Sequence, residues 1–79
     1  MVKRRRREET QEIQALEREM WEARSRLQRA YDAFDLVSDP DLIEAWIFEI
    51  NAQQARYTYL LKRRKALEQA LEKEDEVRT

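Results

Sequence analysis

The chain has 79 residues, so it forms at most one small domain, and the absence of cysteine, histidine and glycine excludes disulfides, common catalytic triads, metal-thiolate sites and phosphate-binding loops. Sixteen basic and seventeen acidic side chains leave a net charge of -1, which by itself indicates neither a nucleic-acid binder nor an acidic mimic. We therefore expect a protein that is not an enzyme and that uses no cofactor, metal ion or small-molecule substrate.

The first segment, residues 1–9, is basic and carries no apolar periodicity. Its run from Lys3 to Arg7 resembles the start of a signal peptide, but acidic residues follow where export requires an apolar stretch. No apolar run in the chain is long enough to span a bilayer. We expect residues 1–9 to be disordered and the protein to be cytoplasmic.

A first helix is predicted over residues 10–34, because apolar residues recur there in alternating steps of three and four. This spacing is the heptad pattern of a helix that packs along one seam against another helix. The seam consists of Ile13, Leu16, Met20, Ala23, Leu27, Ala30 and Phe34.

Residues 35–39 are predicted to form a turn, and a second helix is predicted over residues 40–73. Pro40 cannot continue a preceding helix but suits the first position of a new one. Asp39 is placed to cap that helix, and Asp41 lies favourably near the positive end of the helix dipole. The acidic tail, residues 74–79, is expected to fray because negative charge is unfavourable at a helix C-terminus.

A connection of about five residues makes the two predicted helices antiparallel neighbours. Folding back around residue 38 places Trp46 opposite Ala30, so that a bulky side chain meets a small one. The sequence therefore predicts an all-α fold, an antiparallel two-helix hairpin that resembles a coiled coil. Two such hairpins could also dimerise into a four-helix arrangement.

The predicted second helix carries further apolar residues on the side turned away from the first helix. One partner helix cannot cover both sides, so this stripe predicts association with a second copy or with another helical protein. Trp21 lies outside the first seam, where it either folds over the edge of the stripe or contacts a partner. Alternatively, the alanines are only good helix formers and the aromatic residues are tolerated at the surface. The predicted partner interface consists of Trp21, Ala45, Phe48, Ala52, Ala55 and Tyr59.

Two basic clusters near the open end of the predicted hairpin support a second hypothesis. Together they could bind phosphates of nucleic acid or of an anionic membrane surface. Acidic residues within the same turns reduce the local positive charge, and a run of charge more often forms a solvated face. We therefore rank this function below protein interaction. The candidate phosphate contacts are Lys3, Arg4, Arg5, Arg6, Arg7, Lys62, Arg63, Arg64 and Lys65.

Three segments, Phe34 to Ile43, Glu49 to Ala52 and Ala55 to Leu61, give the chain a resemblance to the YaaL-like family of small uncharacterised bacterial proteins. The resemblance covers roughly Trp21 to Lys65. It implies a cytoplasmic protein of Gram-positive bacteria with no known enzymatic activity and no established binding residues. Similar proteins are often encoded beside a recombination mediator and a regulator of sporulation, which adds some weight to the nucleic-acid hypothesis.

Overall fold

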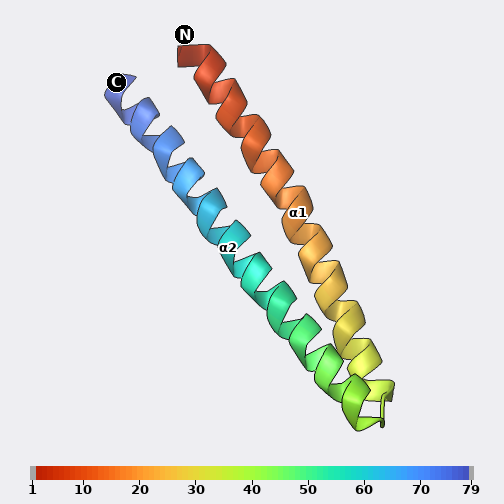
Figure 1. Cartoon of the computed structure of the whole chain (residues 1–79). Helices are drawn as coiled ribbons and strands as arrows, with labels where there is room; N and C mark the ends of the chain where they lie inside the picture. The colour runs from red at the N-terminus through yellow and green to blue at the C-terminus, as the bar shows by residue number, and fades with distance from the viewer. Residues whose placement is uncertain (1, 79) are drawn as a thin grey trace.

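The computed structural model describes the backbone of residues 2–78 and the side chains of residues 7–74. Helix α1 spans Val2–Leu36 and helix α2 spans Pro40–Arg78. The two helices run antiparallel and side by side, with both termini at the same end of the hairpin (Figure 1). The hairpin is 60 Å long and 15 by 14 Å in cross-section. The predicted all-α antiparallel hairpin is confirmed.

Both helices extend further than the sequence pattern predicts. α1 begins at Val2 instead of about residue 10 and continues to Leu36. α2 continues to Arg78 instead of about residue 73. Arginine, lysine and glutamate favour helix, and no glycine or proline interrupts either helix near the termini, so backbone hydrogen bonding continues past the end of the apolar seam. The seam therefore indicates where the helices pack and not how far they extend.

The turn between the helices contains the cap that the sequence predicts. Asp39 Oδ1 accepts hydrogen bonds from the backbone N–H groups of Asp41, at 2.9 Å, and Leu42, at 3.3 Å. The carbonyl oxygen of Asp39 accepts another from the N–H of Ile43, at 2.9 Å, and Pro40 is the first helical residue. No described residue has positive φ, so the chain reverses direction here without needing glycine. The predicted start of the second helix is confirmed.

Replacement of Asp39 by Ala is expected to lower the free energy of unfolding by about 1 kcal/mol, because two backbone N–H groups lose their acceptor. Asp39→Asn is the matched control, since asparagine caps helices about as well as aspartate. Thermal unfolding followed by circular dichroism measures both. Equal midpoints for the Ala and Asn variants would show that the cap contributes nothing to stability.

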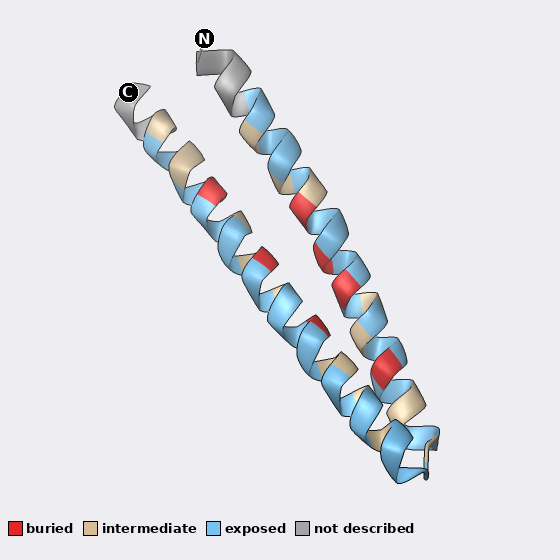
Figure 2. Cartoon of the chain, in the orientation of Figure 1, coloured by how far each residue is buried: buried red, intermediate tan, exposed pale blue. Residues whose placement is uncertain are grey.

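The core is a narrow strip along the two facing sides of the helices, as the buried residues in Figure 2 show. Ala23 and Ala30 are 1% and 0% exposed, and such small residues let the two helices approach closely. Among the described residues, the buried apolar set is Leu16, Met20, Ala23, Ala30, Leu60 and Leu67. Four of these, Leu16, Met20, Leu60 and Leu67, form one cluster against which Ile13, Tyr57 and Leu61 pack.

One buried position in this strip is polar, which the sequence reading did not predict. Gln53 is 8% exposed and its Nε2 donates a hydrogen bond to Glu49 Oε1 at 3.1 Å. Its Oε1 has no hydrogen-bond partner among the described residues. A glutamine at this position buries less apolar surface than a leucine would. The apolar seam is therefore interrupted once, by a polar side chain, in the middle of the hairpin.

Candidate protein interface

Five of the six predicted interface residues lie together on an uncovered side of α2, which we call the outer face: Ala45, Phe48, Ala52, Ala55 and Tyr59. All five are exposed, and Phe48 and Tyr59 keep 66% and 64% of their surface accessible. Steps of three and four residues place them along one line of the helix. α2 contacts α1 through a different side, which carries Gln53 and Leu60. The outer face is thus free while the hairpin is fully folded.

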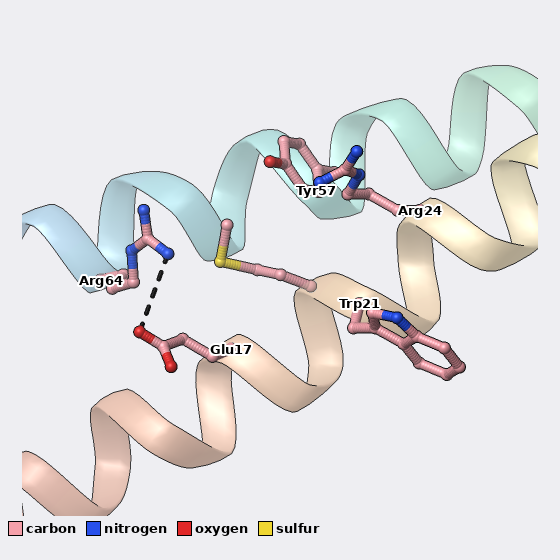
Figure 3. A pocket seen from close by; sticks show the side chains of 6 residues that line it. Glu17, Trp21, Arg24, Tyr57 and Arg64 are labelled. Carbon is pink, nitrogen blue, oxygen red and sulfur yellow. Dashed lines mark ion pairs between the residues drawn. The ribbon is translucent and has the colours of Figure 1, made fainter.

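Trp21, the sixth predicted residue, is 70% exposed. Its ring points away from α2, while Arg24 extends across toward Tyr57 on the other helix (Figure 3). These residues line a shallow depression between the helices, together with Glu17, Met20 and Arg64. An ion pair of 3.9 Å between Arg64 Nη1 and Glu17 Oε1 crosses it. Trp21 remains largely open to solvent and does not complete the core.

The structure does not bring Trp21 onto the outer face of α2. Tyr57 lies on the side of α2 that shares the depression with Trp21. Each residue of an α-helix is turned by about 100° from the one before, so Tyr59 is turned about 200° from Tyr57 and Phe48 about 180°. A single partner helix therefore cannot cover Trp21 and the outer face at once. The two remain separate candidate contacts.

The second basic cluster, residues 62–65, is partly neutralised by carboxylates. Arg63 Nη2 lies 2.9 Å from Glu12 Oε1 and joins the two helices. Arg64 Nε lies 3.5 Å from Glu68 Oε1 on the next turn. Lys62 and Lys65 are exposed.

The N-terminal basic cluster, residues 3–7, is described only in part. The side chains of Lys3, Arg4, Arg5 and Arg6 lie outside the described residues, and Arg7 is exposed. Binding of phosphate by the two clusters stays a prediction.

Over the part of the chain that the structure describes, neither helix carries an apolar stretch long enough to cross a membrane. Among residues 7–74, no three carboxylates gather into a group that could hold a metal ion. Apolar side chains are instead exposed on the outer face of α2 and at the depression beside Trp21.

The fold and these surfaces define a class of protein, a small α-helical hairpin with an uncovered apolar face on one helix. The profile of a family described as "Protein of unknown function (DUF2508)" matches residues 1–71, and the chain belongs to this family. No curated protein and no solved structure matches the chain.

Proposed function

We propose that the protein is a helical-hairpin interaction module that acts by binding a protein partner through the outer face of α2, and that it carries out no catalysis. The observation that supports this is the exposure of Phe48, Tyr59 and three alanines on one line of a helix whose opposite side is already packed. Burial of one large apolar side chain is worth about 1.5–3 kcal/mol. A partner that covered both aromatic residues would gain several times the thermal energy.

The small core gives a second reason to expect a partner. Only six apolar residues are buried among those described, and the chain has no cysteine or histidine with which to form a disulfide or a zinc site. Domains of this size usually gain stability from such staples or from association. Without a disulfide or a zinc site, association is the means of stabilisation that remains for this chain.

Within the DUF2508 family we place the chain near the YaaL-like bacterial proteins, with the cytoplasm as its compartment. The support is the resemblance over roughly Trp21 to Lys65. Trp21 is a second contact point in this proposal, since tryptophan is common at the centres of interfaces.

Site-specific photo-cross-linking tests the proposed function in cells that naturally contain the protein. A photoreactive phenylalanine derivative replaces Phe48 in one variant and Arg29, an exposed residue of α1 about two turns from Trp21, in the matched control. We expect a covalent protein adduct from position 48 and none from position 29. Absence of adducts from position 48, or equal adducts from both positions, would contradict an interface on the outer face.

Recognition of phosphate would give a different result, because binding through phosphate contacts weakens steeply as salt rises whereas apolar docking is much less sensitive. We expect any binding of DNA or of anionic vesicles to disappear near physiological salt, since Glu12, Glu17 and Glu68 already pair with the arginines. Strong binding at physiological salt that is lost when Arg63 and Arg64 are replaced by Gln would favour a phosphate-binding function instead.

A further inference from the structure

We infer that the outer face of α2 binds the outer face of a second copy of this chain, with the two α2 helices antiparallel about a twofold axis near Ala52. This inference rests on the proposed function and names its partner. Two independent properties of the outer face support it, the sizes of its side chains and the order of the charges beside them.

The sizes of the side chains match when the face is paired with itself in the antiparallel direction. In this register, residues whose numbers add to about 104 lie opposite each other, and each contact occurs twice because the interface is isologous. Phe48 then meets Ala55 of the second copy, and Tyr59 meets Ala45. Ala52 meets Ala52 at the axis. Each exposed aromatic ring is thus placed against an alanine, which leaves room for it.

A parallel pairing of the same face would not match. Phe48 would oppose Phe48 and Tyr59 would oppose Tyr59, while Ala45, Ala52 and Ala55 would oppose alanines. The aromatic pairs would hold the two helices apart, and the space between the alanine pairs would then be empty. Side-chain size therefore favours the antiparallel direction.

The order of the charges along α2 also favours the antiparallel direction. Within residues 40–64, the charged residues before Ala52 are acidic and those after it are basic. The acidic set beside the outer face is Asp41, Glu44 and Glu49, and the basic set is Arg56, Lys62 and Arg63. Antiparallel pairing lays each acidic half against a basic half, and parallel pairing would lay like charges together.

One charged pair fixes the register more closely. Glu49 and Arg56 are seven residues apart, which is about two turns, so both lie on the same flank of the outer face. Around a twofold axis near Ala52, Glu49 of one copy lies beside Arg56 of the other, and the same pair repeats on the other side of the axis. Glu49 is partly buried and Arg56 is exposed in the hairpin.

Nothing in the hairpin obstructs this approach. α1 packs on the side of α2 that carries Gln53 and Leu60, and the outer face is turned away from it. The two copies of α2 overlap from residue 40 to about residue 64, or about 37 Å of helix. The paired α2 helices form the centre of the dimer, and each α1 lies outside them.

Sedimentation of the purified full chain at micromolar concentration tests the pairing. We expect a dimer, weakened at least about tenfold by Phe48→Glu, which buries a charge in the face. Glu49→Arg should weaken it roughly tenfold, since two like-charged pairs replace two opposite ones, and Glu49→Arg combined with Arg56→Glu should restore it. Glu22→Arg on α1 is the control and should change nothing. A monomeric parent, or a double variant no tighter than Glu49→Arg alone, would overturn the inference.

Single cysteines test the direction, because the natural chain has none. Ala52→Cys should form a disulfide between copies on mild oxidation, since the two positions meet at the axis. Tyr59→Cys should not, because the two copies of residue 59 are then about 21 Å apart. Disulfides from both variants would mean parallel pairing. No disulfide from Ala52→Cys would mean that another register or surface is used, and either result overturns the inference.

The dimer and the interaction function fail in distinguishable ways. A monomeric chain whose position 48 cross-links to a different protein in cells overturns the dimer and leaves the interaction function in place. A monomeric chain with no adduct at position 48 overturns both. A dimer in solution together with a self-adduct of twice the chain mass at position 48 supports both.

Discussion

Leu60→Ala should destabilise the hairpin by about 3 kcal/mol, because this side chain belongs to the main apolar cluster and only 3% of its surface is exposed. It packs in the same cluster as Leu16, Met20 and Leu67, and its removal leaves a cavity that two straight helices cannot easily close. A chain of this size has a total stability of only about 4–12 kcal/mol. We expect the midpoint of thermal unfolding to fall by roughly 12–24 °C.

Leu36→Ala is the matched control, since Leu36 is 88% exposed at the end of α1 and the same atoms are removed. We expect a change within about 0.5 kcal/mol. Both variants are compared with the parent at one protein concentration, because a dimer makes the midpoint concentration-dependent. Equal effects of the two substitutions would show that burial in this cluster does not determine the stability of the hairpin.

The fold could be predicted from the sequence because two local signals agree. The heptad spacing from Ile13 to Phe34 fixes one packed side of α1, and the Asp39-Pro40 cap fixes where α2 begins. With no glycine in the chain, helix has few local competitors. A short turn between two such helices leaves the antiparallel hairpin as the simplest way to bury the seam.

The packed side of α2 follows helical period more closely than residue type. Ile47 is apolar but 44% exposed, and Gln53 is polar but buried. Seven-residue steps connect Trp46, Gln53 and Leu60 on one side of the helix, so the period alone would have identified Gln53. A polar side chain at a seam position is easily missed when only apolar residues are counted.

The candidate interface was predicted in one part and not in the other. The outer face of α2 follows from periodicity, which is a property of a single helix. Trp21 could not be placed relative to that face from the sequence, because their relation depends on the rotation of α1 against α2. The structure shows this rotation, because Trp21 and Tyr57 line the same depression.

Ala30→Leu should destabilise the hairpin by about 2 kcal/mol although it adds apolar surface, because Ala30 is 0% exposed and has no room for three further carbon atoms. The larger side chain must push α1 and α2 apart near the turn or take a strained rotamer. Ala66→Leu is the matched control, since Ala66 is an exposed residue of α2 and the two residue types have similar helix propensity. Thermal unfolding of both variants at equal concentration, followed by circular dichroism, measures the difference. If the Ala30→Leu variant melts at or above the temperature of the parent, the helices leave room for a larger side chain at this position. The close contact assigned to Ala30 would then be wrong.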